Sequence, residues 1–154
     1  NHQPKKNMAT NILIADDQPI VRIGLTYLLS KEIDINIAGE ASNYQEMFER
    51  LQQKPGIDLL AISMSLAAQD GYQVLEQLIT RYPQCPVLVL SQYSEPHHAL
   101  RPLGLGAKGY LDKTAIPTEF VKAVRMISTG ARYINEACAT KLAFLKRNGT
   151  SQPT

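Results

Sequence analysis

The sequence predicts an α/β fold in which helices cover both faces of a parallel sheet. From Asn11 onward, short apolar runs alternate with stretches of helical periodicity, which is typical of this class. The apolar runs mostly lack polar alternation, as expected for strands that are buried on both faces. A length of 154 residues, with 44% hydrophobic and 19% charged residues, suits one globular domain with an ordinary core. We therefore expect one doubly wound α/β domain with short tails.

Five apolar runs predict five strands. They cover Ile12 to Ala15, Ile35 to Glu40, Leu59 to Ser63, Val87 to Ser91, and Gly109 to Leu111. Four helices are predicted from apolar residues spaced i, i+3, i+4 and i+7, a spacing that forms one buried stripe on a helix. The stripes are Ile20, Ile23, Tyr27 and Leu28; Tyr44, Met47, Phe48 and Leu51; Val74, Leu75, Leu78 and Ile79; and Phe120, Val121, Val124 and Ile127.

Prolines and glycines refine the remaining elements. Pro19 and Pro117 fit the first turn of a helix, where a missing amide proton costs nothing. The segment from Ser94 to Gly106 should form a further helix, but Pro102 interrupts it, and glycines follow. We therefore expect that helix to be short, kinked or mobile. Gly130 to Asn135 is predicted to be a turn, and Glu136 to Lys146 a last helical stretch.

Composition limits the possible partners. No apolar run approaches the roughly 20 residues that cross a bilayer, and the start of the chain is polar, so we expect a cytoplasmic protein without a membrane partner. The net charge of +2 comes from 16 basic and 14 acidic residues spread along the chain, so this segment is not expected to bind nucleic acid directly. Cys85 and Cys138 have no second Cys or His at metal-ligand spacing.

The candidate site consists of polar residues at the carboxyl ends of the strands, where open α/β sheets bind their ligands. Asp16 and Asp17 follow the first strand in ILIADDQP. Ser63 ends the third strand, Ser91 ends the fourth, and Lys113 follows the fifth in GYLDK. The sequence thus predicts one constellation assembled from four strands.

This constellation resembles that of bacterial response-regulator receiver domains, most closely the NarL/FixJ (LuxR-type) family, from Asn11 to Asn135. In that family an acidic pair follows the first strand, an aspartate ends the third, a Ser or Thr ends the fourth, and a Lys follows the fifth. Four of these roles are matched, by Asp16, Asp17, Ser91 and Lys113, and Tyr110 matches the aromatic switch residue. The resemblance implies a flavodoxin-like (CheY-like) sheet of order 2-1-3-4-5 and no enzyme activity.

The fifth role is the departure. Alignment without a gap puts Ser63 at the phosphoacceptor position and Ala67 where a proline usually follows. A neutral hydroxyl is a poor nucleophile unless an adjacent base activates it, and the sequence places no histidine near that strand end. Mg²⁺ favours carboxylate oxygens, so losing one of three should weaken its binding. We expect an atypical receiver that is not phosphorylated on Asp, has no catalytic residue or required cofactor, and keeps at most a weak Mg²⁺ site at Asp16 and Asp17.

The resemblance also suggests how the chain is organised and which partners it has. Residues 1–9 are expected to be a disordered tail, 10–130 the receiver domain, 131–147 a linker turn and helix, and 148–154 a tail toward a helix-turn-helix DNA-binding domain of the full-length protein. A homodimer is expected, with a sensor kinase or another protein as a possible partner. A salt bridge from Lys113 to the Asp16 and Asp17 carboxylates should neutralise the site.

Several alternatives stay open. Ser63 is an introduced change in an ordinary two-component receiver, or the chain is a stand-alone protein-binding module. In a further alternative, Ser91 and Lys113 have no switch role and are merely polar residues at a solvated loop end. A hydrolase with a nucleophilic aspartate is disfavoured, because Gln18 and Pro19 follow Asp17 where that class needs an acid two residues after its nucleophile.

Overall fold

A six-stranded parallel sheet forms the centre of the molecule, which is described by a computed structural model over residues 9–66, 70–93 and 96–147. The strand order is β2-β1-β3-β4-β5-β6, so the predicted order 2-1-3-4-5 is confirmed and one edge strand is added. The strands are β1 (Thr10–Ala15), β2 (Ile35–Ala41), β3 (Leu59–Ser63), β4 (Val87–Ser91), β5 (Gly109–Asp112) and β6 (Tyr133–Ile134).

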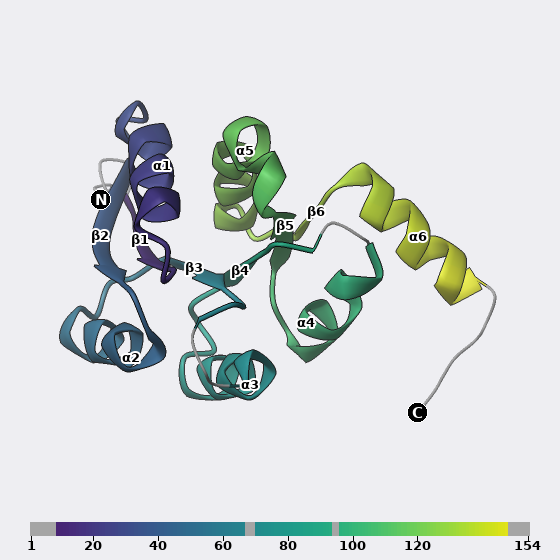
Figure 1. Cartoon of the computed structure of the whole chain (residues 1–154), viewed down its shortest axis with the longest axis horizontal. Coiled ribbons are helices and arrows are strands. Elements are labelled where there is room, and N and C mark those ends of the chain that lie inside the picture. The colour runs from purple at the N-terminus through teal and green to yellow at the C-terminus, as the bar shows by residue number, and fades with distance from the viewer. Residues whose placement is uncertain (1–8, 67–69, 94–95, 148–154) are drawn as a thin grey trace, which may run out of the picture.

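Helices cover both faces of this sheet (Figure 1). One face carries α1 (Pro19–Ser30) and α5 (Ile116–Ser128), and the other carries α2 (Tyr44–Gln53), α3 (Gly71–Arg81) and α4 (Leu100–Leu105). The last helix, α6 (Glu136–Arg147), extends away from the sheet beyond β6. Two short 3₁₀ turns, η2 (Pro96–Ala99) and η3 (Lys113–Ala115), precede α4 and α5.

The core consists of two hydrophobic clusters, one on each face of the sheet. Ile12 and Ile14 pack with the apolar side of α5, including Phe120. The alternate residues Leu13 and Ala15 pack with α2 and α3 on the opposite face. Because successive strand side chains point to opposite faces, a strand buried on both faces must be apolar throughout. The apolar runs of the sequence therefore predicted the sheet correctly.

Local signals fix where the helices begin. The Asn43 side chain accepts a hydrogen bond from the Glu46 N–H at 2.8 Å and caps α2. Asp70 caps α3 in the same way, accepting from the Tyr72 N–H at 3.0 Å. Such caps satisfy amide donors that have no partner inside the helix. Prolines occupy the first turns of α1 and α5, as predicted. Both capped helices start at the carboxyl edge of the sheet, beside the candidate site.

The buried stripe predicted for the first helix is wrong at three of its four residues, since only Leu28 packs partly against the core. Ile20, Ile23 and Tyr27 are 72%, 63% and 59% exposed, whereas Leu25 and Leu29 are buried against the sheet. The physical reason is that α1 (PIVRIGLTYLLS) has apolar residues on most of its sides, so spacing alone did not select the buried face. The stripes predicted for α2, α3 and α5 are buried or partly buried, as expected.

Two further segments differ from, or refine, the sequence prediction. The turn predicted from Gly130 to Asn135 contains the short strand β6, which pairs with β5 in parallel and is too short to show a periodic pattern. The helix expected near Pro102 is short, and Pro102 lies in its first turn, where no helical hydrogen bond is lost. Ser94 at the start of that segment lies outside the described residues, as do almost all of both predicted tails. No helix in the described part of the chain has the length and apolar character that a membrane span requires.

Candidate functional site

The parallel strands bring the predicted polar residues to one edge of the sheet. Asp16 and Ser63 are fully buried there, and Ser91 is nearly so. Lys113 starts η3 directly after β5, and its side chain is 13% exposed. Asp17 differs from its neighbour, because its side chain is exposed to solvent. The constellation expected from the sequence is therefore assembled, with one carboxylate inside and one outside.

Asp16 is held by two neighbours. Its Oδ1 atom accepts a hydrogen bond from the Gln18 N–H at 2.8 Å, which closes the turn after β1. Its Oδ2 atom lies 2.9 Å from Lys113 Nζ in an ion pair that lacks the directional geometry of a hydrogen bond. The same ammonium donates to Gln18 Oε1 at 3.1 Å. A buried carboxylate requires such a partner, since an unpaired buried charge is strongly destabilising. The expected salt bridge of Lys113 is thus formed with Asp16.

Ser63 takes a local partner instead. Its Oγ atom lies 2.8 Å from the Ser65 hydroxyl and accepts the Ser65 N–H at 3.2 Å. Among the described residues, Ser65 supplies every hydrogen bond that this hydroxyl makes. The Ser63 hydroxyl is therefore hydrogen-bonded within its own loop, and the Lys113 ammonium pairs with Asp16 instead. An acidic side chain at this position would have competed with Asp16 for that ammonium.

Ser91 and Tyr110 meet at a shared residue, Tyr93. Ser91 Oγ accepts the Tyr93 N–H at 3.0 Å, and the Tyr110 hydroxyl donates to the Tyr93 carbonyl at 3.0 Å. Tyr110 is only 6% exposed, so its ring faces the interior. The loop after β4 is therefore tied to β5 from inside the molecule.

Sequence reasoning missed the role of Tyr44 at this edge. Its ring is buried, and its hydroxyl has no hydrogen-bond partner among the described residues. A Cβ atom added to Gly71 would lie 3.1 Å from this hydroxyl, which is closer than ordinary contact, so the hydroxyl packs tightly against the start of α3. Burial, followed by the nearby Asp70 and Asp17 carboxylates, raises the pKa of Tyr44 to about 12. Its position at the start of a helix that directly follows β2 was the available signal.

The residues present do not form the three-carboxylate set that the family resemblance implies for Mg²⁺. Asp16 is engaged by Lys113, Asp17 points to solvent, and the third position is a neutral serine. In the described part of the chain, no three His, Cys, Asp or Glu side chains are gathered closely enough to hold a metal ion. Mg²⁺ needs near-octahedral oxygen ligands, and fewer charged ones weaken it. A weak residual site at Asp16 and Asp17 stays a prediction.

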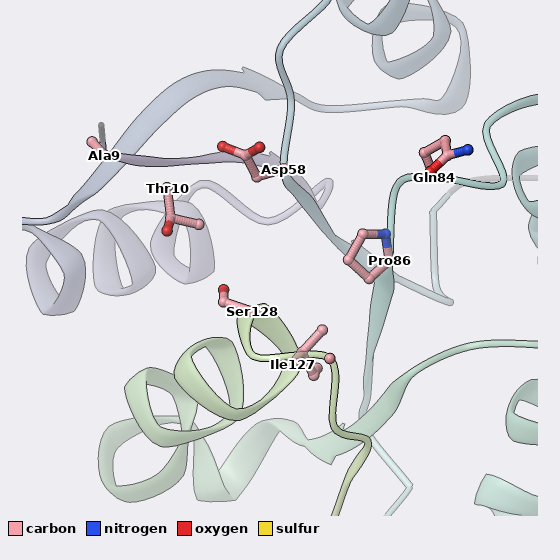
Figure 2. A pocket seen from close by; sticks show the side chains of 8 residues that line it. Ala9, Thr10, Asp58, Gln84, Pro86, Ile127 and Ser128 are labelled. Atoms are coloured by element: carbon pink, nitrogen blue, oxygen red, sulfur yellow. The ribbon is translucent and has the colours of Figure 1, made fainter. Parts of the chain in front are cut away.

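Two hollows lie at opposite ends of the sheet. One, of about 530 Å³, lies at the amino ends of β1 and β4, where Thr10 and Asp58 lie across from Ser128 of α5 (Figure 2). None of the predicted site residues lines it. The other, of about 210 Å³, lies at the carboxyl edge and is lined by Ser91 and Tyr110 together with His98. His98 of η2 therefore shares this pocket with Met64, the residue that follows β3.

Comparison with known proteins identifies the family. The response regulator receiver domain matches residues 12–125. The chain is 36% identical over 112 residues to the uncharacterized transcriptional regulatory protein YhcZ of Bacillus subtilis, covering 72% of this chain and 51% of that protein. It is 33% identical over 133 residues to the transcriptional activator protein ExaE of Pseudomonas putida, covering 86% and 61%. The chain thus spans less than two thirds of the length of these relatives.

A solved structure agrees with this assignment. The two-component response regulator of the LuxR family from Aurantimonas sp. SI85-9A1 superposes with a TM-score of 0.81 at 23% identity, covering 90% of this chain and 99% of that one. At this identity the likeness supports the fold alone, and the fold is the CheY-like arrangement described above. The sequence match over most of the folded domain carries the assignment. This chain belongs to the response regulator receiver domain family.

Proposed function

We propose that this chain is an atypical regulatory receiver that takes no phosphoryl group at Ser63 and has no enzyme activity of its own. This proposal is carried by the observation that Lys113 and Ser63 both have partners already. Lys113 pairs with Asp16, and the Ser63 hydroxyl binds Ser65. In an ordinary receiver, as the family resemblance implies, an aspartate at this position is the nucleophile. Here the nucleophile, one metal ligand and the negative partner of the lysine are all replaced by one neutral hydroxyl.

The chemistry of serine supports the proposal. A hydroxyl attacks phosphorus efficiently only when a neighbouring base removes its proton. Asp16 is the nearest candidate by position, but its carboxylate is already bound by an ammonium and an amide. The His98 ring is stacked on Tyr93, with ring centroids 4.6 Å apart, so it is also engaged. Among the described residues, no base is hydrogen-bonded to Ser63, since its hydroxyl binds Ser65.

In the full-length protein, the receiver is proposed to act in the cytoplasm within a transcriptional regulator. The names of the relatives support this role, and a helix-turn-helix DNA-binding domain beyond α6 would provide the output. A sensor kinase or another protein is the proposed partner, and it would act by binding the receiver instead of phosphorylating Ser63. In this proposal the receiver controls the attached domain through its own association and conformation.

The proposed homodimer uses α1. Ile20, Ile23 and Tyr27 form an exposed apolar stripe along one side of this helix. Apart from its chain neighbours and the backbone of its own helix, no described atom lies within 4 Å of a Cβ position at Gly24, so the stripe is open there. An exposed apolar stripe on a helix favours contact with another apolar surface. In a two-fold symmetric dimer, the same stripe of two copies can pack together. A second copy of this chain is therefore the proposed occupant.

Calorimetry with Mg²⁺ and beryllofluoride, which mimics a phosphoryl group, tests the phosphate-independent input. Ser128→Asp is the matched control for Ser63→Asp, because Ser128 is exposed and lies at the other end of the sheet. We expect no saturable binding by the wild type or by the control, and slow or no acylphosphate formation by Ser63→Asp with acetyl phosphate. Tight, saturable binding of both reagents by the wild type would overturn the proposal. Robust acylphosphate formation by Ser63→Asp would favour an introduced change in an ordinary receiver.

A further inference from the structure

The pocket at the carboxyl edge has the walls of a small-molecule site. It has a volume of about 210 Å³ and lies between the ends of β3 to β5, the start of α3 and α4. The side chains of Met64 and Pro102 provide apolar walls, and Tyr110 lies against the strands. A dry cavity of about 150 Å³ accepts benzene in other proteins, so this volume accommodates one ring with a short substituent.

One wall of the pocket is aromatic. The rings of Tyr93 and His98 are stacked, with centroids 4.6 Å apart and planes inclined by 23°. Tyr93 is 52% exposed and stands at the mouth of the pocket, and its backbone is anchored by Ser91 and Tyr110. Aromatic faces favour planar partners in stacked or edge-on contact. The pocket therefore selects flat ligands.

The Ser91 hydroxyl, which lines the pocket, has unused bonding capacity. The buried Ser91 hydroxyl accepts the Tyr93 N–H, but its own proton has no acceptor among the described residues. A hydroxyl carries one donor and two acceptor sites, so this proton remains available to a ligand oxygen. Among the described residues of the lining, Asp70 is the one acidic side chain, and it disfavours an anion. The complementary ligand is uncharged and carries an acceptor oxygen.

We propose that this pocket binds a small, uncharged, planar aromatic molecule whose carbonyl or hydroxyl oxygen accepts the Ser91 proton, and that this ligand replaces phosphate as the input. The role of the ligand as input rests on the function proposed above, whereas the binding of the ligand does not. The route to the output is short: His98 belongs to η2, and η2 packs against α6, the last described helix. Occupancy of the pocket therefore changes the surface on which α6 rests.

Acetophenone is the probe, since it combines one ring with one carbonyl oxygen and no charge. Ethylbenzene lacks the oxygen, and benzoate adds a charge. Amide NMR titrations of this chain should show saturable shifts at Ser91, Tyr93 and His98 with acetophenone, with a Kd of about 1 mM for a fragment of this size. Shifts should extend to α6. We expect weaker binding of ethylbenzene and the weakest binding of benzoate.

Two serine-to-alanine variants separate this pocket from the hollow at the other end of the sheet. Ser91→Ala should weaken acetophenone binding about tenfold and abolish its preference over ethylbenzene. Ser128→Ala, in the hollow of Figure 2, should change neither. The absence of saturable shifts at Ser91, Tyr93 and His98, or equal binding by both variants, would overturn the inference. Neither result depends on beryllofluoride, so failure of this inference is distinguishable from failure of the phosphate-independent function.

Discussion

At the scale of single residues, the ion pair between Asp16 and Lys113 is the feature on which the carboxyl edge depends. Lys113→Met keeps the length of the side chain but leaves a fully buried carboxylate unpaired. We expect the free energy of unfolding to fall by about 3 kcal/mol, the usual cost of removing one partner of a buried pair. Urea denaturation followed by circular dichroism measures this change. The double variant Asp16→Asn with Lys113→Met should recover most of the loss, and a loss below about 1 kcal/mol in the single variant would contradict the pairing.

Tyr44 gives the opposite expectation, because its buried hydroxyl is unpartnered. Tyr44→Phe removes this polar group without changing the ring, so we expect the free energy of unfolding to rise by about 1 kcal/mol. The control is Tyr133→Phe, which should destabilise the fold, since the Tyr133 hydroxyl donates to Glu119. A loss of stability in Tyr44→Phe would show that the hydroxyl has a partner.

The same tyrosine predicts a pH dependence. Burial and nearby carboxylates raise the pKa of Tyr44 from 10.0 to about 12. The folded state then holds its proton more tightly than the unfolded state, so this contribution is present below pH 10.0 and is lost as the pH rises through about 12. Between these values the wild type should lose stability more steeply than Tyr44→Phe in urea titrations. Identical slopes would remove Tyr44 as the cause.

Residue identities at the site were predictable, but their pairings were only partly so. Asp16, Ser63, Ser91 and Lys113 follow or end parallel strands, whose carboxyl ends must share one edge, and the pairing of Lys113 follows from charge. The Ser63 to Ser65 contact depends on loop geometry that no periodic pattern encodes. Tyr44 was predicted as part of a buried stripe and is buried, yet the pattern did not indicate that its hydroxyl reaches the start of α3.

At the scale of elements, α1 tests the proposed homodimer. Ile23→Glu puts a charge in the middle of the exposed stripe, so we expect the dimer dissociation constant in analytical ultracentrifugation to rise at least about tenfold. Ile33→Glu is the matched control, because Ile33 is the more exposed isoleucine and lies outside the helix. Its dissociation constant should remain that of the wild type. A monomeric wild type, or equal weakening by both variants, would exclude the α1 stripe as the interface.

The same helix shows why sequence predicts the existence of elements better than their orientation. In α2 and α5, polar residues fill one side, so the apolar stripe has one possible direction. In α1, apolar residues occur on most sides, and contact with the sheet decided that Leu25 and Leu29 turn inward. The face left outside is apolar at Ile20, Ile23 and Tyr27, and packing of the core does not account for it. This residual hydrophobicity is the observation that motivates the dimer.

At the scale of the whole molecule, the fold was predictable because the central strands β1, β3 and β4 are buried on both faces. That condition forces continuous apolar runs, which sequence shows directly. The edge strand β6 escaped prediction because two residues are too few to show a pattern, and only its pairing with Gly109 and Tyr110 of β5 defines it. Contacts between segments that are distant in the sequence are likewise visible only in three dimensions.

One such contact joins α5 to the turn before β2. Arg125 Nη1 lies 2.8 Å from Asp34 Oδ2, and Arg125 also binds Glu32. The hydrogen bond from Arg125 lowers the pKa of Asp34 below its ordinary 3.8. Stability from this pair is therefore present above pH 3.8 and is lost as the pH falls through the lower folded value. Because these side chains are largely exposed, salt should screen the pair.

Arg125→Met should therefore lower the thermal unfolding midpoint slightly near neutral pH and low salt. The difference from the wild type should shrink at about 1 M salt, where the screening length is only about 3 Å, and again in acid once Asp34 is protonated. Arg101→Met is the control, since Arg101 stacks on Tyr72 and its contribution is not tied to a carboxylate. Thermal melts at both salt concentrations and both pH values measure these differences. A midpoint difference that persists unchanged in acid and high salt would mean that Arg125 stabilises the fold by packing, and that α5 and the turn before β2 are joined without help from charge.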